Sequence, residues 1–483
     1  MPLLGTPRRK PGALGTGPVG TLEVTDMRRI VHITLLALAC GAPAAWATDL
    51  LQAWQAAQQN DRELAVARAA QATAQPRRDQ AAALWRPGVA FNASAGVATG
   101  ESEMRGAQFS APGMGTSGGV NFGTSVTGGT ATRWALQASQ PLYNPQRRAQ
   151  QQQLGLQADM ADLEWQAAQQ ALMLRTAQRY FDVAVAQEAL GVLDRQLQAV
   201  QKAATEAQDR FDIGSAPVTD THEARARLAA LRAQRLAAQT DFDVKRRALA
   251  DSTGLAPTAL AVRLPGGAAA TAPRALEAWQ QEAEAANPAI RLQQLAADIA
   301  RAEAEKHRRS ASATVDLVAQ AGQERLHGSG DYGSARNKSV NALVGVQLNV
   351  PLFTGGYRSA KEEEALRLFD KAQAQVQSTR EQVAQQVHGA WLGLSLGAER
   401  VQALAEALSA SEARRDATQT GHEVGHRTLL DRLNAENDTA AARLALAQAR
   451  AGLLLDRLRL AQLVGRLDED ALRAANQALS AAP

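Results

Sequence analysis

The fold of this chain is decided by residues 183–211, VAVAQEALGVLDRQLQAVQKAATEAQDRF. Small and apolar residues recur along this stretch in steps that alternate between three and four, which is the pattern of a coiled-coil seam. A seven-residue repeat kept up over this length imposes a left-handed supercoil, because it underwinds the ideal helix. The seam residues are Val183, Ala186, Leu190, Leu193, Leu197, Val200, Ala204, Ala207 and Phe211.

The helical pattern extends beyond this seam. It runs back without a proline to Gln146 and forward to about Asp212. A helix over residues 146–212 is about 100 Å long, at 1.5 Å of rise per residue. No ordinary globular core accommodates a rod of that length, so the sequence predicts a long coiled-coil architecture.

The composition favours long helices over a core filled with aromatic residues. The chain has 483 residues, of which 4% are aromatic, and Ala, Gln, Leu and Arg dominate. The formal charge of +4 is small for this length, and acids and bases are interspersed. Because no basic block stands out, we expect no nucleic-acid partner.

Residues 1–47 are predicted to be a signal peptide preceded by a spurious extension. From Met27 the sequence MRRIVHITLLALACGAPAAWA has a basic start, an apolar run and an Ala-Trp-Ala cleavage box, as a secretory signal does. The Gly- and Pro-rich residues 1–26 point to a mis-assigned start codon. The single cysteine, Cys40, lies in the signal, so the mature chain would have no disulfide. Lipid attachment to Cys40 is the alternative, but Ala37 stands where that motif usually has Leu.

The remaining chain reads as two copies of one unit followed by a C-terminal tail, residues 467–483. The first repeat, 48–265, has a helix up to residue 84, a β-hairpin at 88–141, a long helix at 146–212 and a helix at 218–251. The second repeat, 266–466, has a helix at 276–309, a β-hairpin at 313–352, a long helix at 357–423 and a helix at 429–464. In the hairpins, strands flank Gly-rich segments that we predict as loops, at residues 100–131 and 323–337.

The two repeats match residue by residue at an offset of about 210. Chance similarity between Ala-rich helices does not explain matching hairpins at matching places, so we interpret the chain as an internal duplication. The matched segments are Pro141-Leu142-Tyr143 with Pro351-Leu352-Phe353, Tyr180 with Trp391, and Phe211-Asp212-Ile213-Gly214 with His422-Glu423-Val424-Gly425.

The strands have the properties of membrane strands. Residues 340–350 have the length of a transmembrane β-strand, with one apolar face and one face of small residues, Asn and Gln. A half-buried strand of a soluble sandwich is the ordinary alternative. Aromatic residues lie near the hairpin bases, as in a membrane-interface girdle. Four strands cannot close a barrel, so several chains would have to share one; two chains give about eight strands, and three give about twelve with room for a channel.

From about Asp49 to Ala475, the order of elements resembles that of the TolC family of outer-membrane exit channels. The specific segments are Arg210-Phe211-Asp212-Ile213-Gly214 with Thr219-Asp220, Gly421-His422-Glu423-Val424-Gly425 with Arg427-Thr428 and Asp431, and the junction Pro351-Leu352-Phe353-Thr354-Gly355-Gly356.

This resemblance implies a mainly α-helical fold with a membrane β-barrel. Each chain of a homotrimer would give four strands to a shared 12-stranded barrel, and its helices would form a tunnel across the periplasm. Helical tips at residues 213–218 and 424–429, with turns at Gly214 and Gly425, would dock a periplasmic adaptor tied to an inner-membrane ABC or proton-driven transporter. The Thr219-Asp220 pair resembles the toxin-secretion branch more than the lipid-anchored efflux branch.

The resemblance also implies the residues that close the tunnel entrance. The latch between neighbouring coils would use Thr219, Asp220, His422 and Arg427, with Arg427 and Asp220 as a charge-assisted link. An acidic ring would include Asp431, but its second position here is Asn434, which halves the expected charge. Since His422 stands where the family pattern has tyrosine, we hypothesise a pH-sensitive latch.

Plainer interpretations of these residues stand beside this one. Asp220 and Asp431 each follow a helix break, where an acid favours the helix dipole whatever the function. Arg427 fits a solvated surface charge equally well. We find no nucleophile elbow, no phosphate-binding loop and no metal-ligand spacing, so we predict neither an enzyme nor a cofactor.

The sequence therefore predicts an exit duct for type I protein secretion or efflux, spanning the outer membrane and the periplasm. The alternative is a soluble periplasmic coiled-coil scaffold or adaptor without a barrel. A charge at Leu136 or Val344 should block outer-membrane assembly only in the first case. The transported substrate and the partner pump are left unspecified.

Overall fold

The computed structural model of the chain describes residues 49–260, 262–266, 274–331 and 333–480. Contacts divide the chain into two units, Met1–Ala47 and Thr48–Pro483, and every described residue belongs to the second. The predicted signal peptide, with Cys40, lies outside the described residues.

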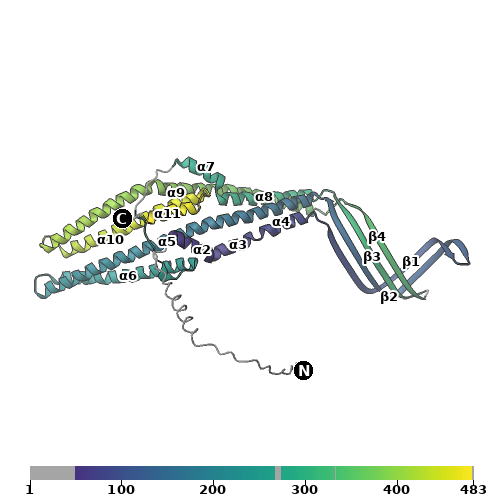
Figure 1. The fold of residues 1–483 in the computed structure, drawn as a ribbon, viewed down its shortest axis with the longest axis horizontal. Helices are drawn as coiled ribbons and strands as arrows, with labels where there is room; N and C mark the ends of the chain where they lie inside the picture. The colour runs from purple at the N-terminus through teal and green to yellow at the C-terminus, as the bar shows by residue number, and fades with distance from the viewer. Residues whose placement is uncertain (1–48, 261, 267–273, 332, 481–483) are drawn as a thin grey trace, which may run out of the picture. The chain divides into compact units, whose positions relative to one another are not determined.

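Two hairpins of long helices form the main part of the second unit (Figure 1). In the first hairpin, α5 (Pro145–Asp212) packs along α6 (Val218–Thr253), and in the second, α9 (Tyr357–Glu423) packs along α10 (Leu429–Leu463). The predicted seam of α5 is buried or half-buried from Val183 to Ala207, which confirms it. Phe211 is exposed, because it lies where the hairpin turns. None of the described helices combines the length and apolar content that a bilayer crossing requires.

The two shorter helices that the sequence predicted before each hairpin are interrupted. The first is divided into α2 (Leu50–Asn60), α3 (Arg62–Gln71) and α4 (Ala74–Ala83). The break at Asp61 arises because its carboxylate accepts the Leu64 backbone N–H at 2.9 Å and so begins a new helix. The second is divided into α7 (Leu276–Ala286) and α8 (Pro288–Arg309), where the Asn287 side chain caps α8. A short 3-10 turn, η1 (Pro257–Ala259), follows α6.

The predicted C-terminal tail contains a helix, α11 (Glu469–Ser480). Its buried residues Leu472, Ala475 and Leu479 join the largest apolar cluster, together with residues of α2, α5, α6 and α10. The Leu50 N–H donates to Asn476 Oδ1 at 3.0 Å, and Asn476 Nδ2 donates to Asp49 Oδ2 at 3.0 Å. The start of α2 is thereby hydrogen-bonded to α11.

Two matched aromatic residues reach the segments that connect the helices. Tyr180, buried on α5, accepts the backbone N–H of Arg263 at 3.0 Å through its hydroxyl. Burial raises the pKa of Tyr180. Trp391 on α9 donates its indole N–H to the Arg274 carbonyl at 3.0 Å. Each long helix is therefore anchored midway to a connecting segment.

The strands form one antiparallel sheet in the order β1 (Gly88–Ala111), β2 (Gly115–Tyr143), β3 (Thr314–Gly330), β4 (Gly333–Asn349). The predicted loops at 100–131 and 323–337 are wrong, because these residues extend the strands. Gly123 pairs with Glu103, and Gly129 pairs with Gly328. Backbone hydrogen bonds hold such a ladder whatever the side chains, so Gly- and Ser-rich strands form when a partner strand continues beside them.

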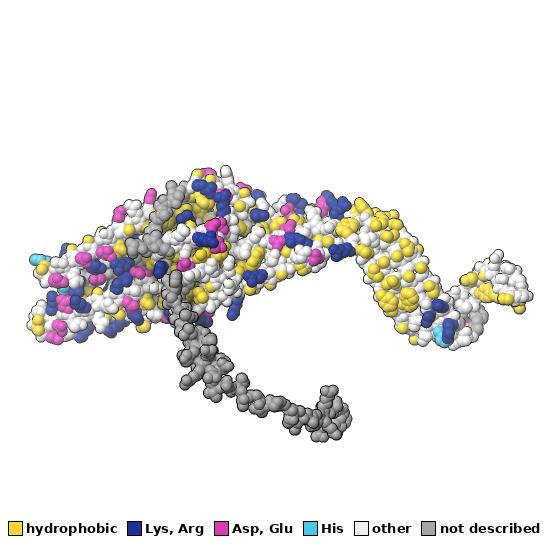
Figure 2. Space-filling view, viewed as in Figure 1, with side chains coloured by type: hydrophobic (Ala, Val, Ile, Leu, Met, Phe, Trp, Pro, Cys, Tyr) yellow, Lys and Arg dark blue, Asp and Glu magenta, His cyan; other side chains and the backbone are white. Residues whose placement is uncertain are grey.

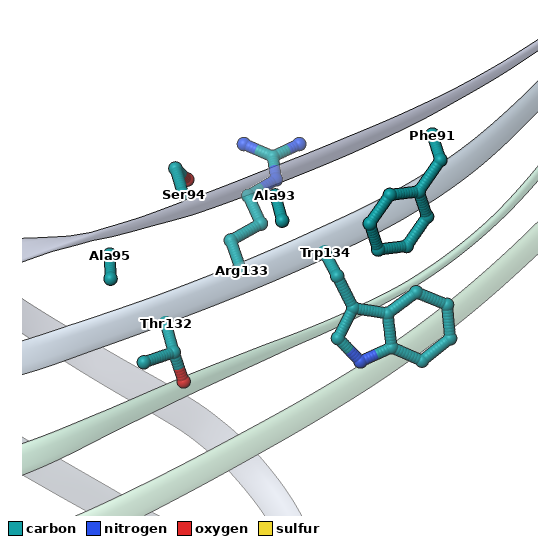
Figure 3. Close-up of a pocket in the computed structure, with 7 residues that line it drawn as sticks. All are labelled: Phe91, Ala93, Ser94, Ala95, Thr132, Arg133 and Trp134. Atoms are coloured by element: carbon teal, nitrogen blue, oxygen red, sulfur yellow. The ribbon is translucent and has the colours of Figure 1, made fainter. Parts of the chain in front are cut away.

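The sheet has one apolar and one largely polar face, as predicted. Figure 3 shows Thr132 and Trp134 on one side of the strands and Ser94 and Arg133 on the other. Figure 2 shows hydrophobic side chains gathered over the sheet, whereas charges of both signs cover the helices. Residues paired in register share a face, and the apolar one carries Val89, Phe91, Ala93 and Val97 of β1, Trp134 and Leu136 of β2, Val315, Leu317 and Ala319 of β3, and Val344, Val346 and Leu348 of β4.

Candidate functional site at the helix tips

The two helical hairpins turn in the same way. Gly214 and Gly425 have φ of +73° and +83°, a left-handed conformation that only glycine adopts without strain. Ser215 N–H donates to the Arg210 carbonyl at 2.8 Å, and His426 N–H donates to the Gly421 carbonyl at 2.8 Å. This bond between residues five apart marks a Schellman ending of α5 and of α9. The two tips thus share this hydrogen bond, and the second adds one from the Arg427 N–H to the Gly421 carbonyl at 3.1 Å.

Both tips expose a large apolar side chain just before the glycine. Ile213 is 79% exposed and Val424 is 63% exposed. Val218, the first residue of α6, and Leu430 in the first turn of α10 are also exposed. Exposed apolar side chains gathered at one place are a usual mark of a contact surface.

Two of the predicted latch residues are in contact within the second tip. His422 is buried, with 9% exposure, and its Nδ1 donates to the Arg427 carbonyl at 3.1 Å. The Arg427 side chain lies over Gly421, where a Cβ would come within 2.8 Å of Arg427 Cγ. The imidazole therefore fixes the backbone of the turn, and the guanidinium is exposed.

The other two latch residues lie on the first hairpin. Thr219 is exposed and Asp220 is half-buried, both in the first turn of α6. Within a single chain, the described residues hold no ion pair between Arg427 and Asp220. The predicted link between neighbouring chains stays a prediction.

The two predicted ring residues differ in their surroundings. Asp431 and Thr428 form a reciprocal cap of α10, in which the Thr428 N–H donates to Asp431 Oδ2 and the Asp431 N–H donates to Thr428 Oγ1, both at 3.1 Å. These bonds, the backbone one first, lower the pKa of Asp431. Asn434, one turn on, is exposed. The cap accounts for Asp431 locally, and the ring stays a prediction.

An ion pair that the sequence analysis missed joins the two hairpins near these tips. Arg432 Nη1 on α10 donates to Glu206 Oε2 on α5 at 3.0 Å, and Arg210 Nη2 donates to Glu206 Oε1 at 3.0 Å. The Arg432 side chain is only 9% exposed, and that of Glu206 is 33% exposed. One sequence feature could have indicated this pair: Arg432 is a cation that lies next to Leu433, on the buried stripe of α10.

The surroundings of Glu206 favour its charged form. Burial alone would raise the pKa of the carboxyl, but the hydrogen bond and charge of Arg432, with the charge of Arg210, outweigh burial and lower the pKa. The nearby His422 adds to this lowering. Leu429 and Leu433 pack beside the pair against Val200, Ala203, Ala207 and Ala224. A charged contact and an apolar contact thus hold the two hairpins together in one chain.

The described part of the chain contains no group of three or more His, Cys, Asp or Glu side chains placed to hold a metal ion. The tips instead combine exposed apolar residues, capped helix ends and ionic links between helices. Such an arrangement is suited to binding and to conformational change between packed states.

Comparison with known proteins gives consistent matches. The family model described as "Outer membrane efflux protein" matches residues 53–255 and 279–466. Outer membrane protein TolC of Escherichia coli (strain K12) is 28% identical over 361 residues, which cover 72% of each chain. The alkaline protease secretion protein AprF of Pseudomonas aeruginosa is 27% identical over 338 residues, 69% of each. Among solved structures, outer membrane protein VceC of Vibrio cholerae superposes with a TM-score of 0.68 at 20% identity, covering 87% of this chain and 98% of VceC.

Proposed function

The chain belongs to the outer membrane efflux protein family, and from this membership we propose that three copies assemble into an exit duct for type I protein secretion. The chain is an outer-membrane channel with a large helical part in the periplasm. In our proposal it works with a periplasmic adaptor and an inner-membrane transporter, which supplies the energy. We assign it no enzymatic activity and no cofactor.

The observation that carries the trimer is the open sheet. Strands β1 and β4 are the edges of the described sheet, and the backbone groups on their outer sides need partners in a membrane. Pairing β4 of one copy with β1 of the next satisfies these groups. Three copies then give twelve strands, a ring wide enough to leave a channel, with the apolar faces toward lipid.

The duplicated tips support adaptor docking. Ile213 and Val424 present apolar side chains from equivalent turns, so a trimer would offer six similar docking points. The same equivalence supports an internal duplication, with repeats at 48–265 and 266–466. An adaptor could therefore bind both tips through one kind of binding surface.

The entrance residues act as a latch and a ring in this proposal. Thr219, Asp220, His422 and Arg427 link neighbouring coils, and Asp431 with Asn434 lines the entrance. Arg427 supports this role because its guanidinium is exposed and forms no salt bridge within the described part of its own chain, although its charge helps to lower the pKa of Asp431. Opening is a change between two packed arrangements of the hairpins.

Secretion is favoured over drug efflux by two observations. Thr219-Asp220 at the start of α6 resembles the secretion branch more than the efflux branch, and a relative of similar coverage, AprF, is named for the secretion of a protease. A soluble scaffold is disfavoured, because it gives no role to a sheet with an exposed apolar face.

The mass of the native particle tests the proposal. Washed outer membranes are extracted with mild detergent, and the particle is weighed by light scattering and then placed in a planar bilayer. Three chains with a stable conductance are expected. A monomer or dimer recovered from the soluble periplasm would refute the shared channel and restore the scaffold.

A further inference from the structure

Four basic side chains lie on the same face of the sheet as the apolar residues, next to the end of the apolar series. They are Arg325 and His327 of β3 and Arg336 and Lys338 of β4, called here the basic cluster. Arg325 pairs in register with Lys338, and His327 pairs with Arg336. All four residues are exposed. In Figure 2, Lys and Arg side chains with a histidine lie beside the end of the hydrophobic part of the sheet.

The register places the basic cluster on the apolar face. On β4, every second residue from Val340 to Leu348 faces this side and is apolar, and Lys338 and Arg336 are the next two in that series. On β2, Thr132 and Thr130, which follow Trp134 on this face, pair with Arg325 and His327.

In a sheet that spans the membrane, the basic cluster would lie at the height of the membrane surface. Nine residues from Val340 to Leu348 span about 30 Å along the strand, close to what a tilted transmembrane strand requires. β3 follows α8 and β4 leads toward α9, so the cluster is near the end of the sheet that is remote from the helices. Because the helices are periplasmic, this end faces the outer leaflet.

The basic cluster has no counterion within the described chain. None of its four side chains joins an ion pair among the described residues. The adjacent acid, Glu324, pairs with Arg133 and so lies on the other face. Cations directly opposite each other on neighbouring strands destabilise a sheet unless an anion lies between them. The arrangement therefore favours an anionic partner.

We propose that the basic cluster binds the phosphate groups of the phosphorylated glycolipid of the outer leaflet. The acyl chains would lie along Val340, Val344 and Ala321, and the phosphates would meet Arg325, Arg336 and Lys338. Guanidinium groups suit phosphate because they donate two parallel hydrogen bonds. A lipid that carries a phosphate beside its acyl chains fits an apolar band of the sheet that ends in cations. This inference rests on the proposed membrane-spanning sheet.

The test uses the full-length trimer in a non-ionic detergent, titrated with fluorescent bisphosphorylated lipid A. The variant Arg325→Gln/Arg336→Gln/Lys338→Gln removes three charges and keeps the sheet pairing. At roughly fivefold per cation near a charged membrane surface, its affinity should fall about 100-fold. The matched control, Arg62→Gln/Arg232→Gln/Arg457→Gln, removes three exposed charges from helices and should bind as the wild type does.

Further arms identify the source of the phosphate. Dephosphorylated lipid A should bind the wild type about as weakly as the intact lipid binds the triple variant, and millimolar inorganic phosphate should not compete. Equal binding of both lipids by the wild type, or unchanged binding by the triple variant, would overturn the inference. Effective competition by inorganic phosphate would overturn the lipid as its source.

Trimer mass and conductance, measured on the same samples, separate two kinds of failure. A wild type without trimers would refute the proposed function, whereas a conducting trimer without phosphate-dependent lipid binding would refute only this inference. If the triple variant does not assemble, Lys338→Gln alone should still lose about fivefold in affinity.

Discussion

Arg432 on α10 and Glu206 on α5 form an ion pair across 3.0 Å that ties the two helical hairpins of one chain together near their tips. The predicted latch acts between chains, whereas this pair acts within one. In the proposed trimer, the two hairpins of one chain should therefore move together when neighbouring chains separate.

Replacing Arg432 by Ala should lower the free energy of unfolding by about 1–2 kcal/mol. Removing one partner of a buried pair typically costs about 3–5 kcal/mol, but water can reach the partly exposed Glu206 and reduces this cost. Arg210→Ala is the control, since it removes only a pair within α5 and should cost about 0.5 kcal/mol or less. Thermal unfolding of both variants decides the matter, and equal losses would contradict a link between hairpins.

The Glu206 pair should also contribute to acid sensitivity. Because the folded-state pKa of Glu206 is lowered, its stabilisation is complete above the unfolded-state pKa, near 4.3, and is lost as the pH falls through the folded-state value. Glu206→Gln should be less stable than the wild type at pH 7, and the difference should shrink in acid. A constant difference from pH 7 to pH 3 would count against this linkage.

The orientation of the sheet can be tested at two neighbouring residues. Val344 lies in the middle of the apolar face, and Leu343 lies on the other face. Val344→Arg should cost about 2–4 kcal/mol at the bilayer midplane and abolish trimers in washed outer membranes. Leu343→Arg should be tolerated in a wet lumen. Loss of trimers in both variants would contradict this orientation.

The two interpretations of Asp431, as helix cap and as ring, lead to different results. Thr428→Ala should cost about 1 kcal/mol in stability, because it removes a cap, and leave ion block unchanged. Asp431→Asn keeps an acceptor for the cap but should weaken block of the channel by Mg²⁺. Asn434→Asp should strengthen block by at least ~5-fold, since it adds a carboxylate per chain. If none of these changes alters block of the channel by Mg²⁺ in planar bilayers, the proposed acidic ring is refuted.

The hydrogen bond from the Arg263 N–H to the Tyr180 hydroxyl should affect only the free energy of unfolding. Tyr180→Phe leaves the Arg263 N–H without its acceptor and should cost about 1 kcal/mol. Tyr180→Ala also empties a buried aromatic site and should cost about 3–5 kcal/mol. Calorimetric unfolding of the two variants measures the difference, and a neutral Tyr180→Phe would show that water replaces the hydroxyl.

Much of the fold followed from local patterns. The seam at Val183–Ala207 was readable because small apolar residues repeat at helical spacing, and strand β4 was readable because Val and Leu alternate. The Gly- and Ser-rich extensions of β1 and β2 were missed because their pairing, not their side chains, makes them strands. The interruption at Asp61 was not predicted, because an acid inside a helical pattern does not by itself indicate a cap.

The site was predictable only in part for a similar reason. Gly214 and Gly425 were recognisable because a turn between helices needs a residue that tolerates positive φ. The contact between Glu206 and Arg432 depends on how α5 packs beside α10, and residues 226 positions apart give no local signal of it. The roles of Thr219, Asp220 and Asn434 depend on neighbouring chains and stay predictions.

The bonds from Asn476 to Leu50 and Asp49 have a consequence for biogenesis. The packing of α2 is completed by α11, and Leu50 and Asn476 are 426 positions apart, so the periplasmic part cannot finish folding before α11 has also been exported. A chain that stops before Glu469 should reach the periplasm with α2 uncovered and be degraded by proteases there. An exposed α2 would thus mark a chain whose export stopped before α11.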